Sequence, residues 1–183
     1  MSFITIYDKL RRMDDFTYNE LSRDKLYDTL ALIRDVFMEF EAPDYSKEGI
    51  AEFLDFLEPL SITAMLDDGE IRIWICEYDG CIIGAIAAGE KHINLLFVDG
   101  KFHRRGIARR LLEIMIENYK PTMITVNSSP YAIEAYKKLG FVETDSEREE
   151  NGIRFTPMKR VIPSLRSVAR KALHTEAIQS PKT

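Results

Sequence analysis

The chain has 183 residues, 45% hydrophobic and 30% charged, and its 25 Lys and Arg against 30 Asp and Glu give a formal net charge of −5. This length favours one domain, since a domain takes about 150 residues. The composition is that of an ordinary globular protein and excludes a disordered, collagen-like or disulfide-rich chain. The acidic balance argues against a protein that coats duplex nucleic acid.

The chain also lacks the patterns of a membrane, secreted or metal-binding protein. Its longest apolar and glycine run, 81–89, is far shorter than the roughly 18 residues of a membrane span, and charges interrupt the first fifteen residues, where a signal peptide is apolar. We therefore expect a cytoplasmic monomer or homodimer without membrane or nucleic-acid partners. Cys76 and Cys81 flank the expected Asp-Gly turn, where a disulfide is conceivable, but in the cytoplasm we expect reduced thiols. Because neither CxxC nor HExxH occurs, we expect no metal site.

Hydrophobic periodicity predicts two helices and then three strands in the first half of the chain. Apolar side chains recur every three or four residues through 23–40, as on one face of an amphipathic helix. The Ala-Pro-Asp sequence at 42–44 ends this helix, and Ser46 can cap a second, short helix. From Pro59 the period changes. We expect strands over 71–78, 81–88 and 92–98, the first two joined by an Asp-Gly turn.

The second half alternates helices and strands. A helix begins near Ile107 and ends before Pro121, and a strand follows over 122–126. Ser129 can cap a further helix with Pro130 at its first position, and Gly140 suits the left-handed residue that ends it. Two last strands are expected over 141–148 and 153–159, joined through an Asn-Gly hairpin turn.

These elements predict an α/β (α+β) domain with a mixed, mostly antiparallel central sheet flanked by helices. We expect the domain to occupy residues 16–160. It would follow an N-terminal extension over 1–15 and precede a basic C-terminal tail over 161–183.

Chemistry concentrates in residues 95–112, where an apolar strand leads through a basic turn into an amphipathic helix. Unpaired N–H groups at the helix start and the helix dipole favour an anion there, and Gly106 lets a ligand approach the backbone. Between positions 101 and 120 there are six Lys and Arg against two Glu. The pattern indicates a phosphate cradle, or alternatively a helix that begins at a glycine and carries a solvated basic face.

Two motifs and the order of the elements resemble the GNAT superfamily of acetyl-CoA-dependent N-acetyltransferases. The family's turn, Arg/Gln-x-x-Gly-x-Gly/Ala, reads His-Arg-Arg-Gly-Ile-Ala at 103–108. Asn127, followed by Tyr-Lys-Lys-Leu-Gly-Phe at 136–141, fits the family's second half. The resemblance covers about residues 16–159 and implies a GNAT-like acyl-CoA N-acyltransferase fold. It departs from the family at His103, where relatives have arginine or glutamine.

The resemblance implies that acetyl-CoA binds as co-substrate. Its pyrophosphate would lie on the N–H groups of 104–109, and Arg104 or backbone amides would bind it in place of the arginine or glutamine that His103 replaces. Its pantetheine would run beside the strand at 96–98, where the N–H of Phe97 or Val98 would polarise the thioester carbonyl. The expected cofactor-binding residues are Leu96, Phe97, Val98, His103, Arg104, Arg105, Gly106, Ile107, Ala108, Arg109, Asn127 and Tyr136.

The resemblance also implies a general acid at Tyr136, which would protonate the departing CoA thiolate, with Tyr131 as the alternative. A base assists because an alkylammonium has a pKa of about 10.4. We expect His92 in this role, with Asn94 on the same strand face. The competing candidates are Glu77, Glu39, Glu41 and a chain of water molecules.

The region that selects the acceptor in this family is acidic here. Positions 39–70 hold ten Asp and Glu but one Lys, which would steer a cationic amine, although a solvated helix face gives the same run. Aromatic residues that could line a pocket or build the core are Phe37, Phe40, Tyr45, Phe53 and Phe56.

We expect an N-acetyltransferase that passes the acetyl group directly to a primary amine of a small molecule or peptide. The alternative is a non-catalytic acyl-CoA-binding sensor or interaction module. A nucleotide-binding protein is a weaker alternative, because neither GxxxxGK[ST] nor GxGxxG occurs.

Overall fold

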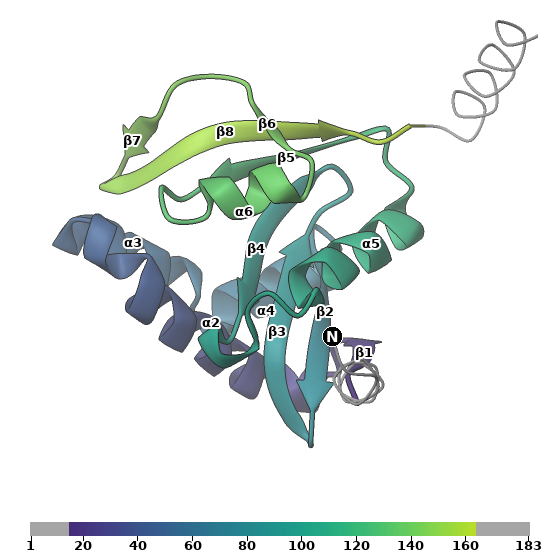
Figure 1. Ribbon diagram of the computed structural model, residues 1–183. Coiled ribbons are helices and arrows are strands. Elements are labelled where there is room, and N and C mark those ends of the chain that lie inside the picture. The colour runs from purple at the N-terminus through teal and green to yellow at the C-terminus, as the bar shows by residue number, and fades with distance from the viewer. Residues whose placement is uncertain (1–14, 164–183) are drawn as a thin grey trace, which may run out of the picture.

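The computed structural model describes residues 15–163, which form one mixed sheet with helices on both faces (Figure 1). The helices are α2 (Leu26–Phe40), α3 (Lys47–Phe56), α4 (Pro59–Asp67), α5 (Ile107–Tyr119) and α6 (Ile133–Lys138), with 3-10 turns at Arg23–Lys25, Ala42–Asp44 and Gly100–Phe102. The strands are β1 (Thr17–Glu20), β2 (Arg72–Tyr78), β3 (Cys81–Ala88), β4 (His92–Val98), β5 (Met123–Ser128), β6 (Val142–Glu143), β7 (Arg148–Glu150) and β8 (Ile153–Val161).

The strands follow the order β1-β2-β3-β4-β5-β8-β6, and β7 pairs with β8. Every pair is antiparallel except β4 and β5. This parallel pair forms only at His92 with Thr125 and Ile93 with Val126. Beyond Ile93 the two strands separate, and Figure 1 shows β5 and β8 crossing the top of the view away from β4. The rest of β4 therefore has a free backbone edge on its β5 side.

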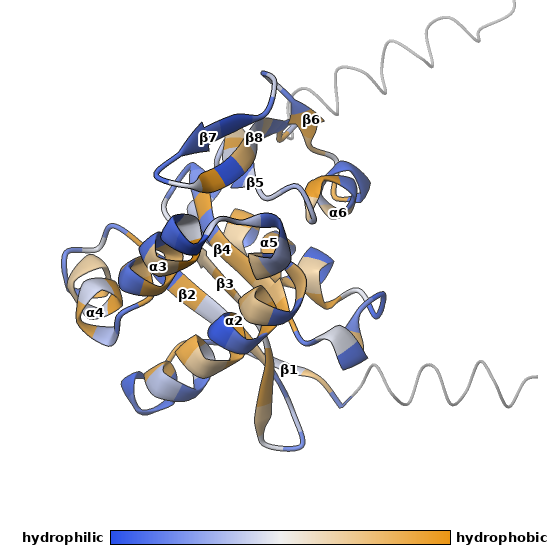
Figure 2. Ribbon diagram, turned by 90° about the vertical axis from the view of Figure 1, so that its left-hand side faces the viewer, coloured by the Kyte–Doolittle hydropathy of each residue, from blue (hydrophilic) through white to orange (hydrophobic). Residues whose placement is uncertain are grey.

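The helices cover the two faces of the sheet and divide the core. On one face α5 buries Ile107, Leu111 and Met115, which confirms the predicted apolar stripe. On the other face α2 buries Ile33 and Phe37. Each such side chain contributes about 1.5–3 kcal/mol of hydrophobic stabilisation. Figure 2 shows the apolar strands β2, β3 and β4 in the middle of the molecule between these helices.

The start of α3 packs closely on the turn between β7 and β8. Ser46 caps α3 as predicted, with its hydroxyl accepting from the N–H of Gly49 over 3.1 Å. A Cβ atom at Gly49 would lie 2.0 Å from the carbonyl oxygen of Gly152, so only glycine permits this approach. The predicted Asn-Gly turn is confirmed, since Asn151 and Gly152 have φ of 50° and 76°.

The sequence patterns miss two elements. Strand β1 is polar and mostly exposed, and it exists because its backbone pairs with residues 74–77 of β2. Helix α4 begins at Pro59, where a change to strand periodicity was expected. Its apolar residues do not share one face, because Ile62 is fully buried whereas Leu60 is exposed.

Two boundaries in the second half are also corrected. The strand expected over 141–148 is wrong as one element: Val142–Glu143 and β7, which begins at Arg148, are two separate short strands that each pair with β8. Helix α6 begins at Ile133 rather than at Pro130, because residues 129–132 form a turn in which the N–H of Ala132 donates to the Ser129 carbonyl. The expected N-terminal extension and C-terminal tail fall almost wholly on residues 1–14 and 164–183, outside the described residues.

Candidate active site

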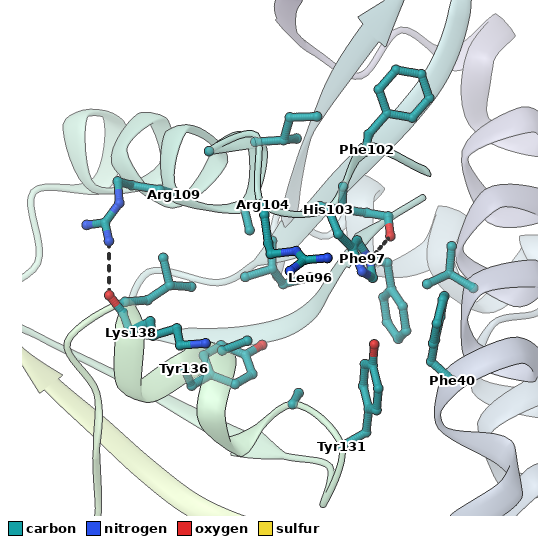
Figure 3. A pocket seen from close by; sticks show the side chains of 18 of the residues that line it. Phe40, Leu96, Phe97, Phe102, His103, Arg104, Arg109, Tyr131, Tyr136 and Lys138 are labelled. Carbon is teal, nitrogen blue, oxygen red and sulfur yellow. Dashed lines mark hydrogen bonds between the residues drawn. The ribbon is translucent and has the colours of Figure 1, made fainter. Parts of the chain in front are cut away.

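A cavity of about 460 Å³ lies where β4 and β5 separate. Strand β4, the turn before α5, the first turn of α5 and helix α6 surround it (Figure 3). All the expected cofactor-binding residues line it except Arg105 and Asn127. Arg105 instead lies over the Phe102 ring, 5.0 Å from its centroid, and Asn127 lines a neighbouring cavity.

The register of β4 decides which of its backbone groups face this cavity. The N–H of Asp99 donates to the carbonyl of Ile83 in β3 over 2.9 Å. Because backbone groups alternate in direction along an antiparallel strand, Phe97 also bonds toward β3, while Leu96 and Val98 turn their N–H and C=O groups to the free edge. Of the two amides expected at the thioester, the one on Val98 faces the cavity and the one on Phe97 does not. Leu96 supplies the second outward amide.

The start of α5 has the features of an anion cradle. Gly106 precedes the helix with a left-handed φ of 86°, and the first helical bond runs from Arg110 N–H to the Gly106 carbonyl over 3.0 Å. The N–H groups at 107–109 therefore have no acceptor within the helix. A Cβ atom at Gly106 would meet nothing within 4 Å, so the backbone is open to a ligand. With Arg104 and Arg109 lining the same cavity, these donors fit the phosphates of CoA.

His103, the departure from the family motif, points inward. Its Nε2 lies 2.8 Å from the Val98 carbonyl oxygen, and because a carbonyl only accepts, Nε2 carries the proton. The imidazole also packs against Phe40, with 5.3 Å between ring centroids. The imidazole is thus engaged with β4 and Phe40.

An interhelical hydrogen bond connects two walls of the cavity. The guanidinium of Arg109 donates to the Lys138 carbonyl at the end of α6 over 3.0 Å, which Figure 3 marks with a dashed line. A cation at a helix C-terminus satisfies an otherwise free carbonyl and complements the helix dipole. Arg109 thus holds α5 and α6 together.

Tyr136 is buried, with 7% of its surface exposed, and its hydroxyl turns into the cavity (Figure 3). Burial raises the pKa of its phenol, and the negative charge of Glu41 raises it further. The phenol therefore stays protonated and can donate. Tyr131, the alternative acid, is 47% exposed and stacks on Phe40 with 5.2 Å between centroids.

A second cavity of about 350 Å³ adjoins the first, between α3, the start of β4, β5 and the β7–β8 hairpin. The residues that line both cavities are Glu41, Leu96, Phe97, Ala132 and Tyr136. Among the described residues that line the second cavity, no Lys or Arg is present, whereas Glu41, Glu52 and Glu150 are carboxylates. Its charge suits a cationic amine.

The acidic and aromatic residues of positions 37–56 divide between core and cavities. Phe37 is fully buried and stacks on Phe53 with 3.8 Å between ring centroids, so it belongs to the core. Tyr45, Phe53 and Phe56 line the second cavity and Phe40 lines the first. Within the acidic run, only Glu41 and Glu52 reach the second cavity.

The candidate bases occupy different places. His92 lines the second cavity, its Nδ1 lies 2.8 Å from Thr125 Oγ1, and burial lowers its pKa. Asn94 lines the same cavity. Glu77 lines neither cavity and pairs with Lys25 over 2.6 Å.

The two other glutamates differ from each other. Glu39 lines a separate surface cavity beside Tyr131. Glu41 lines both main cavities, and burial raises its pKa to about 7 although a hydrogen bond from Ser129 opposes the shift. The sequence suggested Ser129 only as a helix cap. Its side-chain contact with Glu41 depends on a tertiary approach that no local pattern reveals.

Comparison with known proteins agrees with this geometry. Residues 41–162 match the family described as the acetyltransferase (GNAT) domain. The chain belongs to the GNAT family. The uncharacterized N-acetyltransferase YafP of Escherichia coli (strain K12) is 31% identical to this GNAT protein over 79 residues, which are 43% of this chain and 51% of the relative. The match thus spans about half the length of that curated relative.

Solved structures share the GNAT fold. A GCN5-related N-acetyltransferase from Rhodopseudomonas palustris superposes with a TM-score of 0.68 at 21% identity, covering 80% of this chain and 95% of that one. The PaiA N-acetyltransferase of Thermoplasma acidophilum, solved with coenzyme A, gives 0.66 at 16% identity, covering 80% and 99%. These likenesses confirm the expected fold class. The family match makes residues 41–162 an acetyltransferase (GNAT) domain.

Three further features concern only the part of the GNAT protein that the structure describes. None of its helices is both long and apolar enough to cross a membrane. Within residues 15–163, no group of three or more His, Cys, Asp and Glu could hold a metal ion. Cys76 is buried and Cys81 exposed, and both are free thiols.

Proposed function

We propose that this protein is an N-acetyltransferase that passes the acetyl group of acetyl-CoA directly to a primary amine of a small molecule or peptide. The observation that carries the proposal is the position of Tyr136, which lines both cavities beside the free edge of β4. One cavity has the donors for a CoA phosphate, and the other has carboxylates and aromatic rings suited to an amine. The acetyl group would pass from acetyl-CoA to the amine where the two cavities meet.

The first cavity would hold the co-substrate through this chain's own donors. The free N–H groups at 107–109 and the side chains of Arg104 and Arg109 would bind phosphate. The outward N–H and C=O groups of Leu96 and Val98 would pair with the pantetheine amides, as an added strand pairs with a sheet edge. Asn127 would reach the pantetheine arm from the second cavity.

The reaction itself needs a polarised carbonyl and a proton donor. Bound acetyl-CoA supplies the acetyl group as a thioester. An outward amide of β4 would stabilise the oxyanion that forms on amine attack, which is worth about 3 kcal/mol. Tyr136 would give its proton to the sulfur as the C–S bond breaks. For the base, the sequence predicts His92, with Asn94 on the same strand face and Glu41 among the competing candidates.

The test is a coupled assay of CoA thiol release with a panel of primary amines, from diamines to peptides, together with mass detection of the acetylated product. We expect thiol release that depends on the amine, with cationic amines preferred. CoA binding without thiol release from any amine would instead support the sensor or interaction module. The cytoplasmic location and the monomeric or homodimeric state stay predictions of the sequence.

A further inference from the structure

We propose that Glu41 is the group that takes the proton from the acceptor amine, and that the amine reaches it through the second cavity. This inference rests on the proposed function and assigns a role that the sequence left open among several groups. It places the base at the end of α2, away from the strand that precedes the signature turn.

The position of Glu41 is the first argument. It follows the last residue of α2, and its N–H still bonds to the Phe37 carbonyl over 2.9 Å, which fixes the backbone. Glu41 lines both cavities, as do Tyr136 and Leu96. Acid, base and an outward amide therefore meet at the junction where the thioester and the amine would come together.

The position of His92 along β4 makes it a less suitable base than Glu41. His92 lies at the paired end of the strand and lines the second cavity only. It is four residues before Leu96, which is about 13 Å along a strand at roughly 3.3 Å per residue. A general base must come within about 3 Å of the proton or act through one water. Glu41 lines the first cavity as well as the second, whereas His92 lines only the second.

The surroundings of Glu41 suit a base that works near neutral pH. It is half-buried, and no ion pair within residues 15–163 includes it. Burial raises its pKa to about 7, with Asp44 adding to the shift, while the hydrogen bond from Ser129 lowers it. The Ala132 N–H donates to the Ser129 hydroxyl oxygen over 3.3 Å, which orients Ser129.

Other titratable groups face the same junction. Tyr45, Tyr131 and Tyr136 lie close enough for the Glu41 charge to raise their pKa values. The remaining ionisable groups that share one of the two cavities are His92, Glu52, Glu150, His103, Arg104, Arg109 and Lys138. Because the cations lie only in the first cavity, the second presents negative charge to an incoming ammonium.

The proton transfers balance. The ammonium gives one proton to the Glu41 carboxylate, and the free amine forms the C–N bond with the acetyl carbon. The C–S bond breaks, the sulfur takes the Tyr136 proton, and the amine's surplus proton returns to the Tyr136 oxygen. Glu41 then releases its proton to water. The products are the acetylated amine, CoA thiol and one proton.

The experiment is the pH dependence of kcat/KM for the full chain and its variants. For the wild type we expect kcat/KM to fall below a pKa near 7, which forms the acidic limb of the pH profile. Glu41→Gln should lack this limb and should lose about 10²-fold or more in kcat. Its affinity for CoA should be unchanged. Ser129→Ala should move the limb to higher pH, since Ser129 holds the pKa of Glu41 down. Glu58→Gln, an exposed carboxylate outside both cavities, is the matched control and should follow the wild type.

Two results would overturn the assignment. One is a Glu41→Gln variant that keeps the limb and its kcat, and the other is loss of the limb in His92→Gln instead. A titration of carboxyl carbons by NMR, with the Glu41 signal identified as the one absent in Glu41→Gln, separates this failure from that of the proposed function. A Glu41 pKa near that of an ordinary glutamate refutes the base even if no amine is acetylated.

Discussion

The Nε2 of His103 donates a hydrogen bond to the carbonyl oxygen of Val98 over 2.8 Å. That carbonyl is one of the two on the free edge of β4, where we propose that pantetheine pairs. His103 stands where the GNAT motif has arginine or glutamine. In the proposed complex it therefore competes with pantetheine for the Val98 carbonyl oxygen.

Replacing His103 by alanine should strengthen CoA binding. The imidazole no longer has to leave the Val98 carbonyl, and one hydrogen bond is worth roughly 0.5–1.5 kcal/mol net, or about 2-fold to 12-fold in Kd. Calorimetric titration with CoA measures the change. Weaker binding by the variant would mean that His103 contacts the cofactor itself.

Substituting Gly106 by glutamate should abolish CoA binding, because the side chain fills the open cradle and repels phosphate. Gly106→Ala separates charge from backbone strain. Its left-handed φ costs about 1–2 kcal/mol of stability, but its methyl group meets open space, so most of the affinity should remain. Equal affinity loss in both variants would mean that strain, not occupation of the cradle, is responsible.

Removing the hydroxyl of Tyr136 should slow the reaction without loosening the cofactor. We expect Tyr136→Phe to lower kcat by about 10²-fold or more, since a general acid contributes about that much, and to leave the Kd for CoA nearly unchanged. Tyr131→Phe is the comparison, because Tyr131 also lines the first cavity but is 47% exposed. Steady-state kinetics with the best amine compare the kcat of the two variants. An equal loss of kcat in both would mean that the Tyr131 hydroxyl also takes part in the reaction.

Glu41 should also affect the pH dependence of stability. Its folded pKa of about 7 lies above the unfolded value of about 4.3, so the folded chain holds a proton that the unfolded chain loses. The stability from this group is present below about pH 4.3 and is lost as the pH rises through 7. Urea unfolding should therefore find Glu41→Gln more stable than the wild type at about pH 8, by roughly 1–3 kcal/mol, with the gain vanishing near about pH 4. A gain that does not depend on pH would contradict the raised pKa.

Sequence reasoning found the elements whose signals are local. The stripe of α5, the Ser46 cap and the Asn151-Gly152 turn each follow from a few neighbouring residues. Strand β1 was not predicted, because an exposed polar edge strand is stabilised by pairing with its neighbour and not by a hydrophobic pattern of its own. Helix α4 was not predicted, because its apolar residues do not lie on one face of the helix.

The site shows the same division. The cradle at Gly106 is visible in the sequence because a strand, a basic turn and a helix follow one another. The importance of Glu41 among the candidate bases is not visible there, since it depends on Ser129, 88 positions further along the chain, and on a cavity wall built from distant segments. Burial of a carboxylate by distant segments leaves no local pattern.

The central claim is that the acetyl group passes directly from one cavity to the other at Tyr136. Initial rates measured over a grid of acetyl-CoA and amine concentrations, with the intact protein mass recorded after acetyl-CoA alone, test it most directly. Direct transfer predicts intersecting double-reciprocal lines and no acetylated protein. Parallel lines with an acetyl adduct on the chain would contradict it.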